Sequence, residues 1–320
     1  MNRKDSLLTR AQIQDLRSSF GEDLVQDAPV AKYTTMRVGG EADFLLNVTT
    51  FADLEKAVRL CWMEEIPFIL LGAGSNVLVS DAGIRELVIL NRAKKVEFRD
   101  RKGEKPLIWA ESGAGLGSVA RRAANRGWSG LEWAEGIPGT VGGAAVNNAG
   151  AFGSDMAEDL HMAEILHHDN HEIRRVQWSA EDFAYDYRTS LIKRKEVDAV
   201  VLAVEFILER STPDEVKKTM SEITKQRRAK QPPGSSIGSM FKNPPDDYAG
   251  RLIEGAGLKG TRRGDVEISS QHANFFINHG DATAVEVQAL IKLVQQTVEE
   301  KFGVRLELEI ELIGEWQGSI

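Results

Sequence analysis

Hydrophobic side chains recur at helical spacing in several segments whose ends carry helix-start signals. Residues 10–20 predict a short helix. Thr50 with Asp53, and Thr283 with Glu286, form capping-box-like pairs that each open a longer helix. The residues that these two helices should bury are Leu54, Val58, Cys61 and Trp62 in the first, and Val287, Leu290, Ile291, Val294 and Val298 in the second, which should end at Gly303.

Further segments predict strands and one more helix. Apolar runs indicate strands at 42–46, 68–71, 77–79, 87–90, 106–110 and 200–208, and residues 162–179 predict two strands around Asp169–Asn170. Thr212, Pro213 and Glu215 start a helix that ends in the basic residues 225–230. Residues 306–314 alternate apolar residues with Glu307, Glu309 and Glu311, which predicts a last strand. Strands and helices mix without regular βαβ alternation, so the expected fold class is α+β.

The glycine-rich stretch 136–153 is the most unusual part of the chain. Dense glycine allows a backbone to approach another group closely or to adopt positive φ. Thr140, Asn147 and Asn148 add neutral polar groups, and the stretch carries no charged side chain. This composition favours a large, flat ligand lying against main chain. The alternative is a long surface loop, against which the apolar residues Val141, Ala144, Ala145, Val146 and Phe152 argue.

The loop 72–76 follows a predicted strand and imitates the start of a dinucleotide-binding fingerprint. Val77 replaces the third glycine, and strands rather than a helix follow, whereas a Rossmann phosphate site needs a helix N-terminus there. This loop could hold a pyrophosphate only through main-chain N–H groups of a strand–loop–strand nest. Residues 113–117 also miss the fingerprint spacing and indicate a helix entry, and no GxxxxGK[ST] phosphate loop is present.

Composition and charge exclude several classes of function. The formal net charge of −8 argues against bulk binding to nucleic acid or to an anionic membrane. No apolar run has the length of a membrane span, and no apolar segment typical of a secretory signal follows residues 1–6. The single cysteine, Cys61, is expected to be a buried core thiol, which fits a reducing cytoplasm. We therefore expect a cytoplasmic protein, and the charge does not exclude a local basic pocket for a phosphorylated small molecule.

Three histidines, His167, His168 and His171, crowd the predicted turn at 169–170. They could suggest a metal site, but no HExxH motif or cysteine partner accompanies them. A solvated hairpin tip is the expected structure, and no metal is predicted.

Candidate acid–base residues lie outside the glycine-rich stretches. Ser239 follows Gly238 but lacks the GxSxG elbow of a hydrolase nucleophile, and a serine hydroxyl near a reactive carbon can instead relay a proton. Arg188 could pair with a carboxylate or a developing enolate. The structural alternatives are a surface salt bridge for Arg188, a turn for Ser239 and a solvated face for the three glutamates. Strand parity does not decide which glutamate matters.

Taken together and in order, these motifs resemble the UDP-N-acetylenolpyruvoylglucosamine reductase family. The segments that carry the resemblance are 33–40, 72–76, 136–150, 187–190, 238–244, 256–260 and 306–314. The resemblance implies an FAD-binding unit of the vanillyl-alcohol-oxidase (PCMH) type in two subdomains, at 1–92 and 93–211, and a C-terminal α/β substrate-binding domain at 212–320.

The family's reaction is the reduction of UDP-N-acetylglucosamine enolpyruvate to UDP-N-acetylmuramate in peptidoglycan precursor synthesis. Hydride passes from NADPH through non-covalently bound FAD to the terminal enolpyruvyl carbon, and the adjacent carbon then takes a proton. Carried over by motif, Ser239 is the proton donor, while Arg188 and Glu309 flank the substrate carboxylate.

The resemblance also implies binding residues. Those expected to hold FAD are Gly72, Ala73, Gly74, Ser75, Asn76, Gly136, Ile137, Pro138, Gly139, Thr140, Gly142, Gly143, Asn147 and Gly150. Those expected to contact the substrate are Tyr187, Arg227, Lys230 and Asn243, with Arg227 and Lys230 as candidates for the UDP diphosphate.

One departure from the family's longer members concerns the segment after Ser190. Some members carry an insertion there with a tyrosine that closes over the substrate, but here only residues 191–198 precede the next strand. The chain therefore resembles the shorter type II form, expected to be a monomer. Two alternatives remain, a flavin oxidase on the same fold and a flavin-binding sensor or inactive nucleotide-sugar binder. The first lacks a histidine in either glycine-rich stretch to tether FAD, and the second predicts losses among Arg188, Ser239 and Glu309, all of which are present.

Overall fold

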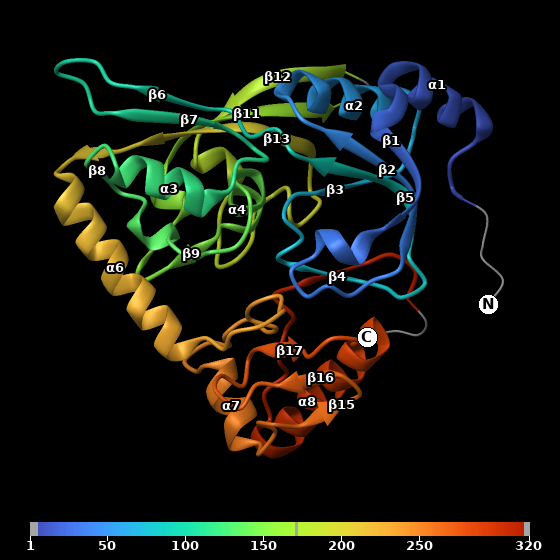
Figure 1. Ribbon diagram of the computed structural model, residues 1–320, viewed down its shortest axis with the longest axis vertical. Helices are drawn as coiled ribbons and strands as arrows, with labels where there is room; N and C mark the ends of the chain where they lie inside the picture. Colours follow the sequence, from blue (N-terminus) through green and yellow to red (C-terminus); the bar gives the residue numbers. More distant parts are fainter. Residues whose placement is uncertain (1–5, 170–171, 317–320) are drawn as a thin grey trace. The chain divides into compact units, whose positions relative to one another are not determined.

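The computed structural model describes residues 6–169 and 172–316, shown as a ribbon in Figure 1. The chain divides into two compact units. Unit 1 comprises residues 1–46, 74–88 and 228–320, and unit 2 comprises residues 47–73 and 89–227. Asn170 and His171, which we expected at a hairpin tip, lie outside the described residues.

Unit 1 is assembled from three separate stretches of chain. Its helices and strands are α1 (Arg10–Phe20), η1 (Gly21–Asp23), β1 (Leu24–Pro29), η2 (Val30–Tyr33), β2 (Glu41–Val48), β4 (Val77–Val79), β5 (Ile84–Asn91), α7 (Ala249–Gly255), β15 (Arg262–Arg263), β16 (Val266–Ile268), β17 (Phe276–Asn278), α8 (Ala284–Phe302) and β18 (Glu311–Ile313). The last residues of β2 (47–48) and of β5 (89–91) belong to unit 2. Strand β1 pairs antiparallel with β2. Strands β15, β16 and β17 form a small sheet of their own, and β18 pairs in parallel with β4.

Helix α8 supplies much of the core of unit 1. The predicted stripe is buried: Val287, Leu290, Ile291, Val294 and Val298 are fully enclosed together with residues of α7, β16 and β17. The predicted capping box is also confirmed, since the Thr283 side chain accepts from the N–H of Glu286 and the Glu286 carboxylate accepts from that of Thr283. Two further N–H groups of the first turn, those of Ala284 and Val285, donate to the carboxylate of Asp81 (2.8 and 3.0 Å).

Unit 2 is built on a sheet with the strand order β12-β11-β13-β7-β6 (Figure 1). Its elements are α2 (Phe51–Met63), β3 (Phe68–Leu71), β6 (Val96–Arg99), β7 (Leu107–Glu111), α3 (Leu116–Ala124), β8 (Trp128–Ser129), η3 (Glu132–Ala134), α4 (Val141–Asn147), β9 (Gly150–Ala151), β10 (Ser154–Asp155), α5 (Met156–Asp159), β11 (Leu160–Asp169), β12 (Glu172–Trp178), η4 (Glu181–Phe183), β13 (Asp198–Ile207), β14 (Glu209–Arg210) and α6 (Pro213–Lys230), whose last three residues belong to unit 1. Helices α2 and α4 pack on this sheet.

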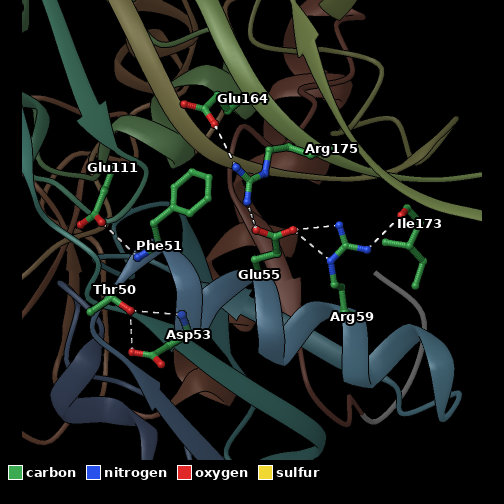
Figure 2. A network of polar contacts seen from close by, with 9 residues as sticks. All are labelled: Thr50, Phe51, Asp53, Glu55, Arg59, Glu111, Glu164, Ile173 and Arg175. Atoms are coloured by element: carbon green, nitrogen blue, oxygen red, sulfur yellow. Dashed lines mark hydrogen bonds and ion pairs between the residues drawn. The ribbon is translucent and has the colours of Figure 1, made fainter.

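A polar network fastens α2 to the sheet, as Figure 2 shows. Thr50 caps the helix as predicted, and the N–H of Phe51 donates to Glu111 at the end of β7 (3.0 Å). Glu55 lies between two arginines, Arg59 on its own helix (2.8 Å) and Arg175 on β12. Burial raises the pKa of Glu55, but the two guanidinium groups outweigh it, so that the pKa lies below its ordinary value.

Most predicted elements are confirmed, and one strand is not. The helices at 10–20 and from Phe51, and the hairpin at 160–178, lie where the pattern placed them. The predicted strand 306–314 is regular only at Glu311–Ile313, although Leu306 and Ile310 are buried as the alternation requires. Upstream of Glu311 the backbone makes one isolated bridge, Leu308 to Phe241, because its neighbour is itself irregular.

Cys61 and Phe152 differ in their burial. Cys61 is buried, as predicted, and burial raises the pKa of its thiol to about 12. Phe152, one of the apolar residues that argued against a surface loop, is 47% exposed, so that part of the argument was wrong. Val141, Ala144 and Ala145 are buried, because they lie on helix α4, which sequence reasoning did not predict.

Candidate functional site

The glycine-rich stretch 136–153 forms a tightly held turn and helix inside unit 2. Thr140 caps α4 by accepting from the N–H of Gly143 (3.3 Å), and the N–H groups of Val141 and Gly142 donate to the carbonyls of Ala114 and Ser112 (2.8 Å each). The first N–H groups of α4 are thus satisfied within the protein. They differ in this from the free N–H groups with which a Rossmann helix N-terminus binds phosphate.

The first predicted FAD loop meets this stretch within unit 2. A Cβ added at Gly72 would lie 2.5 Å from the Thr140 hydroxyl oxygen, and one added at Gly142 would lie 2.7 Å from the Cβ of Ser112. Both positions therefore require glycine, because a side chain would clash. The two loops that were predicted to hold one cofactor are in contact at Gly72 and Thr140. They present main chain and short neutral polar groups, which fits a flat cofactor such as FAD.

The rest of the first loop belongs to unit 1, where the motif 33–40 supports it. Gly74 has φ +59°, and a Cβ there would lie 2.3 Å from the carbonyl oxygen of Tyr33. The N–H of Thr35 donates to the carbonyl of Gly74 (3.0 Å). This explains in physical terms why 33–40 and 72–76 occur together as motifs.

Arg188 and its motif 187–190 are fastened to the residues that follow α4 in unit 2. The guanidinium donates to the carbonyls of Asn148 (3.3 Å) and Gly150 (2.6 Å), and the Arg188 backbone is left-handed, with φ +57°. The buried Ser190 hydroxyl donates to the carbonyl of Val146 (2.6 Å). The structure thus brings Arg188 beside Gly150, one of the predicted FAD residues.

Lys193 is a residue that sequence reasoning missed. Its ammonium donates to the Asn147 side-chain oxygen (2.5 Å), while the Asn147 amide donates to the carbonyl of Gly143 (2.8 Å). Asn147 is therefore oriented from both sides. A lysine three residues after the motif 187–190 carries no signal of this role in the sequence.

Two arginines lie close together in unit 2. Arg227, on α6, lies against Gly136, because a Cβ added to that glycine would be 3.1 Å from the Arg227 Cδ. The Arg227 guanidinium carbon lies 5.3 Å from the centre of the Phe152 ring. Burial lowers the pKa of Arg227, Glu135 opposes that shift, and the positive charge of Arg188 adds to it. A half-buried pair of like charges favours an anionic ligand.

Ser239 and Glu309 lie on adjacent extended segments of unit 1. Ser239 forms an isolated bridge with Phe275 on one side. On the other side the N–H of Glu309 donates to the carbonyl of Met240 (3.0 Å), and that of Lys242 donates to the carbonyl of Glu307 (2.9 Å). The two predicted catalytic residues of this unit are thus held near each other by main-chain bonds.

Asn76 joins the same group in unit 1. Its amide donates to the carbonyl of Glu309 (3.3 Å), and its own carbonyl accepts from the N–H of Glu311 (2.9 Å). Among the three glutamates, Glu307 and Glu311 are exposed and Glu309 is half-buried. Burial therefore distinguishes the residue that the family resemblance selects, where strand parity could not.

The predicted substrate contacts are distributed over both units. Tyr187 is 49% exposed in unit 2. In unit 1, the Asn243 side-chain oxygen accepts from the N–H of Ala249 at the start of α7 (3.1 Å), and Lys230 is exposed at the end of α6.

The histidines of the β11–β12 hairpin have structural surroundings. His168 stacks on Trp62 (5.3 Å between centroids), and His167 lies against Trp178 (6.0 Å). Within residues 6–169 and 172–316, no group of three or more histidine, cysteine or acidic side chains is arranged to hold a metal ion. In the same part of the chain, no helix is both long and apolar enough to cross a membrane.

Comparison with known proteins gives consistent matches along the chain. Residues 42–176 match the family model described as FAD binding domain, and residues 229–313 match that of the UDP-N-acetylenolpyruvoylglucosamine reductase C-terminal domain. The α+β fold with an FAD-binding part and a C-terminal substrate-domain part is therefore confirmed.

Whole-length relatives agree. The chain is 42% identical to the UDP-N-acetylenolpyruvoylglucosamine reductase of Chloroflexus aggregans over 93% of this chain and 100% of the relative. It is 41% identical to that of Geobacillus thermodenitrificans over 92% and 94%. Among solved structures, it is similar to the UDP-N-acetylenolpyruvylglucosamine reductase (MurB) of Thermus caldophilus, with a TM-score of 0.74 and 36% identity over 91% of this chain and 98% of that one.

Proposed function

This chain belongs to the UDP-N-acetylenolpyruvoylglucosamine reductase family, and we propose that it reduces UDP-N-acetylglucosamine enolpyruvate to UDP-N-acetylmuramate with NADPH. The observation that carries the proposal is the pairing of the Ser239 segment with the Glu309 segment in unit 1. This pairing places a hydroxyl and a half-buried carboxylate on neighbouring extended chains, as an enolate protonation site requires.

FAD is the cofactor of the proposed reaction, and residues 72–76, 136–140, 142, 143, 147 and 150 would hold it. When bound, FAD supplies two-electron transfer, taking hydride from NADPH and passing hydride to the terminal enolpyruvyl carbon. The protein's part is to present main chain and neutral polar groups at these loops. Gly72 and Gly142 support this role because no side chain fits at either position.

The proton that completes the reduction comes from Ser239. Hydride addition at the terminal carbon leaves an enolate-like charge shared with the substrate carboxylate, and the adjacent carbon takes the Ser239 proton to give the lactyl ether. Arg188 stabilises the carboxylate through its planar, charge-assisted donors. Glu309 lies beside the enolate-like charge and orients the Ser239 hydroxyl. The half-buried Arg227 is supported as a diphosphate contact by the like charge of Arg188, with Lys230, Asn243 and Tyr187 as further contacts.

The finer features of the protein are part of the same proposal. A turn at 191–197 leads from Ser190 directly into β13, which supports the type II form without a tyrosine-bearing insertion. We also propose a cytoplasmic monomer with a flavin-binding part in two subdomains, 1–92 and 93–211, and a substrate domain at 212–320.

A stopped-flow experiment with the FAD-bound protein tests the function. NADPH should bleach the flavin band in the absence of oxygen, and UDP-N-acetylglucosamine enolpyruvate should restore it in a second step. If the band recovered only with oxygen and a sugar, the protein would be an oxidase. If the purified protein carried no flavin, it would be a binding protein.

A further inference from the structure

Asn274 is a buried polar residue next to the Ser239 segment, and its side chain bonds to main chain alone. It is 3% exposed. Its side-chain oxygen accepts from the N–H of Phe241 (2.9 Å), and its amide donates to the carbonyl of the same residue (2.8 Å). Its main-chain carbonyl accepts from the N–H of Met240 (2.8 Å). One residue therefore satisfies three main-chain polar groups of Met240 and Phe241, the two residues that follow Ser239.

These bonds reveal an irregular backbone beside the proposed proton donor. In a regular strand the N–H and C=O of one residue point to the same neighbour. Phe241 obeys this rule, since both of its groups face Asn274. Met240 does not, because its N–H donates to Asn274 while its C=O accepts from Glu309. The chain therefore twists at Met240, directly after Ser239.

The residue before Ser239 is also unusual, since Gly238 has φ +87°. Ser239 thus lies between a left-handed glycine and a twisted residue, and no regular ladder holds it in place. The direction of its hydroxyl depends on whatever fixes the twist. Because a side-chain amide can pair with both groups of Phe241 where a second main chain would be out of register, Asn274 is the group that fixes it.

We propose that Asn274 is a positioning residue for proton delivery by Ser239. It contacts neither substrate nor cofactor in this role, and it acts by holding the backbone at Met240 and Phe241 so that the Ser239 hydroxyl faces the enolate carbon. The inference rests on the proposed function and on Ser239 as proton donor.

The test compares the two half-reactions of FAD-bound Asn274→Ala with those of the wild type. Flavin reduction by NADPH should stay within about twofold, whereas reoxidation by the enolpyruvyl substrate should slow about 10²-fold, the usual effect of a reacting group displaced by about 1 Å. Equal slowing of both half-reactions would overturn the proposal.

A double variant shows whether Asn274 acts through Ser239. The double variant should reoxidise less than about twofold more slowly than Ser239→Ala alone, because the hydroxyl that Asn274 positions is already gone. Multiplied effects of the two substitutions would mean that Asn274 acts independently, and the inference would fall while the proposed function stood. If the wild type failed to reduce the substrate at all, both would fall.

The configuration of the product gives a readout that a purely structural role would not change. With the reaction run in D₂O, the wild-type product should carry deuterium at the lactyl carbon in a single configuration. Asn274→Ala product should contain both configurations, because solvent then reaches the enolate from either face. Retention of a single configuration at the slowed rate would count against the proposal.

Asn278→Ala is the matched control. Asn278 is also buried, lies four residues along the chain on β17, and donates from its amide to the carbonyl of Met36 (2.9 Å) rather than to the Ser239 segment. It should lower the melting temperature without changing product configuration. Where Asn274→Ala does not fold, Asn274→Asp decides, since it keeps the acceptor for Phe241 but loses the donor and should show the same mixed configuration.

Discussion

Unit 1 and unit 2 hold their proposed catalytic residues in different ways. In unit 2 the Arg188 side chain is itself a structural element, because its guanidinium donates to the carbonyls of Asn148 and Gly150. In unit 1, the backbone at Ser239 and Glu309 is placed by main-chain bonds and by the side-chain amide of Asn274. Substitutions should therefore separate chemistry from structure in unit 1 and combine the two in unit 2.

The largest expected effect is that of Ser239→Ala. Flavin reduction by NADPH should be near normal, and reoxidation by substrate should slow by about 10²–10⁴-fold because the general acid is lost. The free energy of unfolding, measured in urea, should change by less than about 0.5 kcal/mol. Equal loss in both half-reactions would show that Ser239 is not the proton donor.

A change to the main chain in unit 1 should cost stability instead. Gly74→Ala places a Cβ 2.3 Å from the Tyr33 carbonyl oxygen at a left-handed φ, and should lower the free energy of unfolding by about 2–4 kcal/mol. Gly103→Ala is its control, with φ +87° and nothing within 4 Å, and should cost only about 1 kcal/mol. Similar losses for both would mean that close packing under the 74–76 loop is unimportant.

Arg188→Lys should lower both the rate of flavin reoxidation by substrate and the free energy of unfolding. Lysine cannot reproduce the planar fork, so reoxidation should slow about tenfold or more, and the unfolding free energy should fall by about 1–2 kcal/mol as the bonds to Asn148 and Gly150 weaken. Arg194→Lys in the same segment is the control, since its exposed guanidinium bonds Glu196 and the carbonyl of Ala184 (3.3 Å), and it should lower the reoxidation rate and the unfolding free energy far less. Lost activity with unchanged stability would contradict the difference between the units.

The smallest expected effect is on the pH dependence of stability, through a carboxyl group in unit 2. Burial raises the pKa of Asp159 to about 6, although Trp133 donates to its carboxylate (2.5 Å). A carboxyl whose pKa is raised in the folded protein binds its proton more tightly there than in the unfolded chain. Its contribution to the free energy of unfolding is therefore fully present below pH 4 and is lost as the pH rises through 6.

Asp159→Asn should remove that dependence. Thermal unfolding from pH 4 to 7 should become flatter, and the variant should be more stable at pH 7 by about 1 kcal/mol after allowance for solvent screening. Asp182→Asn, on an exposed turn, is the control. An unchanged slope would place the pH dependence elsewhere.

Elements with local signals could be predicted from sequence, and elements made by packing could not. The capped helices α2 and α8 carry their start signals in Thr50 and Thr283. Helix α4 contains Gly142 and Gly143, which disfavour helix, and it forms because its first N–H groups find carbonyls at Ser112 and Ala114. Its partners lie far away in sequence, so no local pattern could show it.

The same contrast holds for the candidate site. The motifs around Arg188, Ser239 and Glu309 stand out as spaced residue types, and the segments 239–242 and 307–309 do meet. Asn274 and Lys193 act through backbone and side-chain partners, and in the sequence they look like any other polar residue. The alternation at 306–314 indicated burial correctly but not regular pairing, because the twist at Met240 lies in its partner.

The parallel pairing of β18 with β4 has a consequence for the order in which the protein can be made. Residues 311–313 bond to residues 77–79, so unit 1 lacks one of its strands until residue 313 has left the ribosome. At about 5–20 residues per second, the early segment waits on the order of ten seconds or more for its partner. Residues 47–73 and 89–227, which make up unit 2, all emerge before that time. Newborn chains should therefore need protection of residues 77–79 during synthesis, and deletion of residues 311–313 should harm folding of unit 1 first.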